Sequence, residues 1–158
     1  MTMRFLVMGL VSGVMLLSQA SLAATPGETL EPWTLEDQRG EPVQLDDQTR
    51  VLLFAGSRNA ADVVDDALDG LPEGALESHD VLYVADISQL PWLVEKVMVP
   101  MMRSADYRIL LDRESEVAPD QLGNDTVLWL GLDERVVQER RSFDSPEQLR
   151  RALEALEP

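Results

Sequence analysis

Residues 50–71 read RVLLFAGSRNAADVVDDALDGL, and this stretch decides the fold class. Residues 50–55 form a short apolar run of the kind made by a strand that is buried on both faces. The pattern then changes period, because apolar side chains recur every three or four residues from Ala60 to Leu71 while four aspartates fill the other face. That spacing predicts an amphipathic helix directly after the strand. A buried strand followed by a covering helix is the repeating unit of an α/β sheet.

The rest of the chain repeats this unit and then closes it. The other predicted strands are residues 33–37, 42–45, 81–85, 107–111, 127–132 and 136–141. Further helices are expected from near Pro91, ended or kinked by Pro100, and from Asp144, where a capping residue precedes Pro146. Strand, helix, strand, helix, strand, strand, helix is an order that predicts two right-handed parallel crossovers and an antiparallel edge. We therefore expect a mixed central sheet flanked by helices, with a hairpin at its N-terminal side.

The start of the chain predicts a cleavable export signal. Arg4 supplies a positive charge, residues 5–17 are almost wholly apolar, and small residues stand before the expected cut after Ala23. The apolar run is shorter than the roughly 20 residues of a membrane span, and an uncleaved anchor is the alternative. We therefore expect residues 1–23 to be a signal peptide and residues 24–158 to be one periplasmic domain without a membrane span.

The chain of 158 residues is strongly acidic and has no cysteine. Because Arg4 is the one charged residue in the predicted signal, the mature chain keeps 29 acidic residues and 12 basic ones. Phosphate binding needs a basic surface, so we do not expect nucleic acid as a partner. The missing cysteines exclude thiol-disulfide exchange, thiolate metal sites and cysteine nucleophiles. The acidity fits both ordinary solubility and a salt-rich habitat.

The order of the elements and several segments resemble the thioredoxin-like fold. Residues 33–45 are similar to the first hairpin of exported thiol-disulfide oxidoreductases and peroxiredoxins. Residues 50–57 are similar to the strand and turn that present their redox motif, and residues 107–112 and 127–137 to their later strands. The resemblance implies a thioredoxin-like α/β domain over nearly the whole mature chain.

The sequence departs from this family at both halves of the redox site. Where the family has its two catalytic cysteines, this chain has Asn59 and Asp62, which cannot attack a disulfide. The family also has a cis-proline opposite the cysteines, whereas residues 123–126 read Gly-Asn-Asp-Thr here. A cis bond without proline costs about 3 kcal/mol, so we expect a trans peptide and a remodelled surface.

At a finer level the chain resembles short exported proteobacterial proteins that carry the name FAD/FMN-containing dehydrogenase and, more distantly, the YtfJ-like proteins. The segments that carry this resemblance are residues 31–35, 84–87, 100–103 and 108–113. The name implies flavin-linked oxidoreduction as an alternative function. No glycine-rich dinucleotide motif follows any predicted strand, and about 135 residues leave little room for a flavin and a substrate. We therefore expect no cofactor.

Two groups of residues are candidates for a binding surface. The first group is Arg58, Asn59 and Asp62, at the start of the first long helix, where free N–H groups can bind an anion. Capping of the helix by Asn59 or Asp62 is the alternative. Asn124 and Asp125 belong to the same group, because the resemblance places their loop opposite this helix end.

The second group is Trp92, Met101, Met102 and Arg103, an aromatic and methionine segment flanked by prolines. Tryptophan, methionine and arginine are enriched in protein interfaces, which favours a protein contact, and burial of Trp92 inside the domain is the alternative. With Met98, the methionines could instead bind copper(I) or fill the core. We expect a non-redox binding protein whose partner is another periplasmic protein or a small ligand. Flavin-linked oxidoreduction and copper(I) transport are the alternatives.

Acidic residues after the strand at 107–111 have a spacing like the start of a calcium loop. Asp112, Glu114 and Glu116 follow one another at alternate positions, but Val117 stands where the loop needs a glycine. We therefore predict an exposed turn and no metal site there.

Overall fold

The computed structural model describes residues 24–157, so the predicted signal peptide lies outside the described residues. Two short strands, β1 (Thr34–Glu36) and β2 (Pro42–Gln44), pair antiparallel as the expected hairpin. Between them, the carboxylate of Asp37 accepts hydrogen bonds from two backbone N–H groups of the turn at 2.8 and 2.9 Å. An aspartate that bonds the backbone ahead of it in this way stabilises a tight turn.

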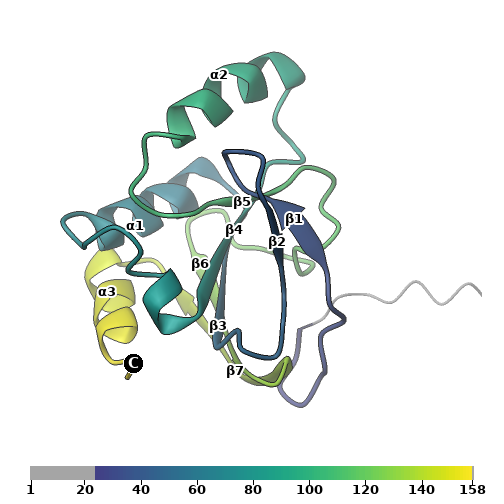
Figure 1. Cartoon of the computed structure of the whole chain (residues 1–158), viewed down its shortest axis with the longest axis vertical. Coiled ribbons are helices and arrows are strands. Elements are labelled where there is room, and N and C mark those ends of the chain that lie inside the picture. The colour runs from purple at the N-terminus through teal and green to yellow at the C-terminus, as the bar shows by residue number, and fades with distance from the viewer. Residues whose placement is uncertain (1–23, 158) are drawn as a thin grey trace, which may run out of the picture.

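A mixed five-stranded sheet forms the centre of the domain (Figure 1). Its strands are β3 (Val51–Ala55), β4 (Val81–Asp86), β5 (Leu110–Asp112), β6 (Val127–Asp133) and β7 (Val136–Phe143). In space their order is β5-β4-β3-β6-β7, with β3, β4 and β5 parallel and β6 antiparallel to both of its neighbours. All five residues of β3 are buried, as the apolar run predicts. The parallel crossovers and the antiparallel closing pair are therefore confirmed.

Helices α1 (Arg58–Leu68) and α3 (Pro146–Glu154) cover one face of this sheet (Figure 1). Their buried stripes, which include Val64 and Leu149, join side chains of the sheet in one hydrophobic cluster. Helix α2 (Trp92–Met102) lies away from this layer and has no buried residue. Within the described part of the chain, no helix is long and apolar enough to cross a membrane.

The opposite face of the sheet carries a second hydrophobic cluster, which no helix of residues 24–157 joins. Loops and the N-terminal segment cover this face instead. Leu30, Leu45 and Ala118 belong to the same cluster as the strand residues Phe54 and Leu130. The two faces of the sheet are therefore buried by different means, helices on one side and irregular chain on the other.

Residues 27–30, called the N-terminal strap below, extend the sheet along the first residues of β7. The N–H of Gly27 donates to the carbonyl of Val137 at 2.8 Å. The N–H of Leu30 donates to the carbonyl of Arg135 at 2.9 Å. Because the strap pairs with this stretch of an edge strand, it keeps the backbone there from pairing with another chain.

The prediction of an exposed turn over residues 112–116 is confirmed for residues 113–116 and is wrong for Asp112. Asp112 is fully buried, and its carboxylate accepts hydrogen bonds from the backbone N–H groups of Glu116, Val117 and Ala118 at 2.8, 3.0 and 2.9 Å. Its role is therefore to organise the loop that follows β5. Within residues 24–157 no three histidine, aspartate or glutamate side chains are placed to hold a metal ion.

Candidate functional site

The end of α1 that follows β3 is where the resemblance places a functional site. Ser57 caps this helix, because its hydroxyl oxygen accepts a hydrogen bond from the N–H of Ala60 at 3.1 Å. The alternative that Asn59 or Asp62 caps the helix is wrong, since both lie inside it and are exposed. The cap was missed because Gly56 and Ser57 follow a strand and are typical of a simple turn.

Polar contacts join this helix end to the loop at residues 123–126. The hydroxyl of Ser57 donates to the backbone carbonyl of Asn124. The side-chain amide of Asn59 donates to Oδ1 of Asp125 at 2.7 Å. We call these two contacts the latch. They bring together two segments that lie more than sixty residues apart in the sequence.

Gly56 lets the chain before α1 pack closely on Leu122, and Gly123 allows a tight turn within the loop at residues 123–126. A Cβ added to Gly56 would lie 2.9 Å from the Cβ of Leu122, which real Cβ atoms do not tolerate. A Cβ added to Gly123 would lie 2.1 Å from Oγ1 of Thr126. No cis peptide bond occurs in the described chain. The loop therefore packs on the helix end as one unit, made of hydroxyl, amide and carboxylate groups and no thiol.

The charge at the latch comes from the protein itself. Helix N-termini favour negative charge, and the carboxylate of Asp125, bonded to Asn59, supplies it here. An external anion would meet this carboxylate at close range. Arg58 and Asp62, the other two candidates of this group, are exposed on the same helix.

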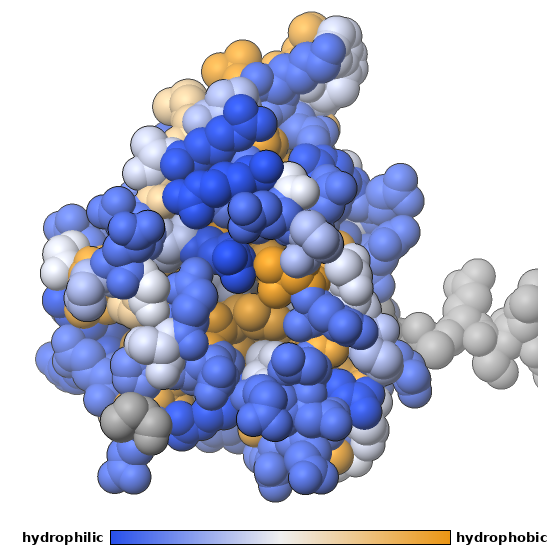
Figure 2. Space-filling model, in the orientation of Figure 1, coloured by the Kyte–Doolittle hydropathy of each residue, from blue (hydrophilic) through white to orange (hydrophobic). Residues whose placement is uncertain are grey.

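Helix α2 carries the exposed apolar surface of the domain. All the exposed large hydrophobic residues in the described part of the chain lie on this helix. They are Trp92 (61% exposed), Leu93 (62%), Val94 (40%), Val97 (62%) and Met101 (68%). Figure 2 shows orange, hydrophobic atoms at the top of the molecule, over α2. The alternative that Trp92 packs inside the domain is therefore wrong.

The other two residues of this candidate group fasten α2 to the domain. Met102 packs against the helix-covered cluster, and Nε of Arg103 donates to the carbonyl of Gln38 at 3.0 Å. Gln38 is fully buried and holds the chain before β5, donating to the carbonyl of Tyr107 at 2.8 Å and accepting from the N–H of Ile109 at 2.9 Å. The structure thus separates the second group into exposed and anchoring residues.

Two tyrosines join α1 to the central sheet and the chain before β5. The hydroxyl of Tyr107 donates to Oδ1 of Asp65 at 2.9 Å, and the rings of Tyr107 and Tyr83 lie 6.1 Å apart. Burial raises the pKa of both phenols well above the ordinary value, and Asp65 raises the pKa of Tyr107 further. Both phenols are therefore neutral under ordinary conditions, and that of Tyr107 donates to Asp65.

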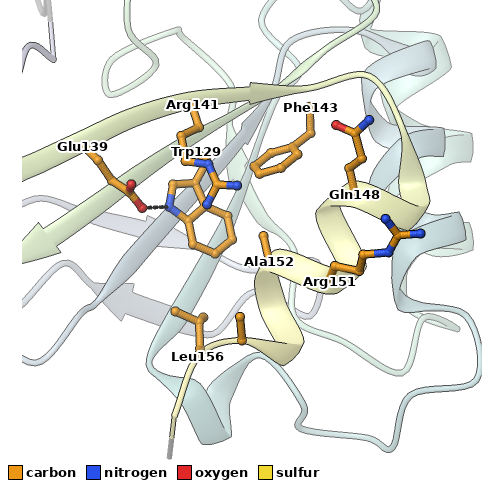
Figure 3. A pocket seen from close by; sticks show the side chains of 9 residues that line it. Trp129, Glu139, Arg141, Phe143, Gln148, Arg151, Ala152 and Leu156 are labelled. Carbon is orange, nitrogen blue, oxygen red and sulfur yellow. Dashed lines mark hydrogen bonds between the residues drawn. The ribbon is translucent and has the colours of Figure 1, made fainter.

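A hollow that the sequence does not indicate lies between β7 and α3 (Figure 3). Its volume is about 490 Å³, and aromatic side chains of β6 and β7 line it together with Arg141 and side chains of α3. The one sequence signal is the alternation of Glu139, Arg141 and Phe143, which places these three residues on one face of a strand.

No family model matches the chain. No curated protein matches it. Solved structures do. Peroxidoxin BcpB from Mycobacterium tuberculosis superposes with a TM-score of 0.54 at 17% identity, covering 84% of this chain and 98% of the other. A thio-disulfide isomerase from Thermus thermophilus superposes with a TM-score of 0.53 at 20% identity, covering 85% of this chain and 99% of the other. An uncharacterised conserved protein from Geobacillus kaustophilus superposes with a TM-score of 0.58 at 20% identity, covering 84% of this chain and 82% of the other.

The fold is thioredoxin-like. The expected fold class, with its mixed sheet, flanking helices and hairpin, is therefore confirmed. At these identities the likeness concerns the fold alone. Unlike a thiol-disulfide enzyme, this thioredoxin-like chain has no cysteine anywhere in its sequence.

Proposed function

We propose that this chain is a non-redox, thioredoxin-like binding protein of the periplasm that docks a partner protein on α2. The docking surface is Trp92, Leu93, Val97 and Met101, called the α2 face below. The observation that carries the proposal is that this one helix holds all the exposed large hydrophobic residues of the described chain. Contiguous apolar patches on soluble proteins mark interaction sites. The predicted signal peptide supports the periplasmic location.

Burial of the α2 face against a partner would contribute favourably to the free energy of binding. Roughly 100 Å² of apolar surface on each of four side chains, at about 25 cal/mol per Å², gives on the order of 10 kcal/mol before the costs of association. That gain suits a specific and reversible contact. Trp92 and Met101 are also of residue types that are enriched at the centres of interfaces.

The charges on the domain favour a different protein over a second copy as the partner. The mature chain has 29 acidic residues against 12 basic ones, so two copies repel each other. On α2 itself, Glu95 is paired with Arg113 at 2.6 Å, and the Lys96 ammonium lies 4.4 Å from the centre of the Trp92 ring. The exposed surface of α2 is thus apolar and nearly neutral, and we expect its partner to offer an apolar groove.

The site at the start of α1 supports a role without redox chemistry. The latch fills the position where the resemblance implies reactive cysteines with an Asn59–Asp125 contact. Copper(I) transport and flavin-linked oxidoreduction stay predictions of the sequence. Met101 is exposed and Met102 packs on the core, so these two thioethers point to different sides of α2. Titration with copper(I) and the visible absorbance of the purified protein test the two alternatives.

A photo-reactive amino acid placed at Val97 tests the proposed interface in cells that produce the protein. The matched control carries the same group at Asp66, an exposed position of α1. We expect a discrete adduct with another protein from position 97 and none of that mass from position 66. Adding Trp92→Ala to the first protein should abolish the adduct, because it removes the largest anchor of the α2 face.

Two results would contradict the proposed function. One is the same set of adducts from both positions, which would show that proximity alone produces them. The other is an adduct that contains only two copies of this chain, which would make the α2 face a self-association surface.

A further inference from the structure

The hollow between β7 and α3 is open to solvent and has aromatic and aliphatic walls. Its volume of about 490 Å³ falls within the range of roughly 300–1,000 Å³ that is usual for ligand sites. The rings of Trp129 and Phe143 meet edge to face on the strand side, with centroids 5.8 Å apart. Ala152 and Leu156 line the helix side. Both rings are almost wholly buried, so a ligand would touch their edges and the aliphatic side chains of α3.

Arg141 provides a positioned cation at this hollow. Its guanidinium carbon lies 4.7 Å from the centroid of Phe143 and 5.6 Å from that of Trp129. Figure 3 shows the side chain of Arg141 beside the indole of Trp129. Stacking on the rings occupies a face of the planar guanidinium and leaves its N–H edges to bind a carboxylate in a two-pronged manner.

Two arginines, Arg141 and Arg151, line the hollow of this strongly acidic chain. Ion pairs with carboxylates engage Arg108, Arg113, Arg135 and Arg150. Among the ion pairs of the described residues, none includes Arg141 or Arg151, although both line the hollow. The one carboxylate in the lining, Glu139, accepts a hydrogen bond from the indole N–H of Trp129 at 3.1 Å. Of the two arginines, only Arg141 is stacked on the rings that line the hollow, so we take it as the main anchor.

We propose that this hollow binds a small organic anion with a flat apolar body. The carboxylate of the ligand meets the guanidinium edge of Arg141, and the amide of Gln148 offers a further polar contact at the same hollow. The apolar body lies between the ring edges and the side chains of Ala152 and Leu156. The proposal does not depend on the α2 face, because the two surfaces share no residue.

Titration with 3-phenylpropanoate, followed by the indole N–H signals of the three tryptophans, tests this site. Trp33→Phe and Trp92→Phe identify the Trp129 signal without altering the hollow. We expect the Trp129 signal to move in a saturable way with a Kd of millimolar order, the affinity expected for so small a ligand. The Trp92 signal should stay in place.

Matched ligands and variants separate the parts of the proposed site. The neutral analogue 3-phenylpropanamide lacks the negative charge, and acetate lacks the flat apolar body. Each should bind at least about tenfold more weakly than 3-phenylpropanoate. Arg141→Gln should weaken binding of 3-phenylpropanoate by about tenfold or more, and Arg151→Gln by less. Arg39→Gln, which removes an exposed arginine of the turn between β1 and β2 that does not line the hollow, should leave the Kd unchanged.

The proposal is overturned if the Trp129 signal does not respond to 3-phenylpropanoate. It is equally overturned if the amide binds as tightly as the acid, or if Arg39→Gln weakens binding as much as Arg141→Gln. Movement of the Trp92 signal alone would place the ligand on the α2 face and remove this site.

Discussion

Replacing Ser57 by alanine removes two contacts of a single hydroxyl group. The oxygen accepts from the N–H of Ala60 at 3.1 Å as the cap of α1, and the hydroxyl donates to the carbonyl of Asn124 in the latch. Loss of an N-cap costs about 1 kcal/mol, and loss of a hydrogen bond costs about 1 kcal/mol more. We therefore expect Ser57→Ala to lower the free energy of unfolding by about 2 kcal/mol.

Ser145→Ala is the matched control for this prediction. Ser145 caps α3 by accepting from the N–H of Gln148 at 3.4 Å, and its second contact is with the exposed side chain of Glu147. This variant should therefore lose about 1 kcal/mol, the value of a cap without a latch. For a chain of this size about 1 kcal/mol corresponds to a change of roughly 3–4 °C in the melting temperature.

Urea and thermal unfolding, both followed by circular dichroism, measure the difference between the two variants. The expected decreases in melting temperature are about 7 °C for Ser57→Ala and about 4 °C for Ser145→Ala. Equal decreases would refute the reasoning, because they would show that the bond to Asn124 adds nothing to the stability of the folded chain.

Three further predictions concern stability. Asp112→Ala leaves three backbone N–H groups without their carboxylate and should cost about 3 kcal/mol or more in urea unfolding, with a smaller loss for Asp112→Asn. Burial raises the pKa of Tyr107, so the contribution of this phenol to the free energy of unfolding is complete below about pH 10 and is lost as the pH rises further. In the variant Tyr107→Phe the melting temperature should therefore fall less steeply at alkaline pH. Raising the salt concentration from about 0.1 to 1 M should raise the melting temperature, because salt screens the repulsion among the 29 acidic residues. An unchanged melting temperature would favour ordinary solubility as the reason for the acidity.

The central layers of the domain could be predicted from the sequence because burial leaves a local trace there. Residues 51–55 are apolar without interruption, as a strand buried on both faces requires, and α1 has aspartates on its exposed side. The side of α2 that faces the domain could not be predicted from the sequence. Apolar side chains occur on all its sides, and its position depends on the contact of Arg103 with Gln38, a residue 65 positions away.

The candidate sites were predictable to different degrees. That residues 58–62 and 123–126 face each other follows from the resemblance, and the Asn59–Asp125 bond joins them. The part played by Ser57 was missed because one serine after a glycine is typical of any turn. The hollow was missed because Trp129, Arg141 and Ala152 meet only when two strands and a distant helix are packed together.

The N-terminal strap imposes an order on the folding of the chain. If the predicted signal peptide leads translocation, the strap is among the first segments to emerge, yet Leu30 and its partner Arg135 lie 105 positions apart in the sequence. The last edge of the sheet therefore stays open until nearly the whole chain has crossed the membrane, and a long loop must then close. During that interval the apolar face beneath the strap is available to chaperones and proteases. Pairing of the strap with β7 is thus a late step, because it requires the chain to be present as far as Val137.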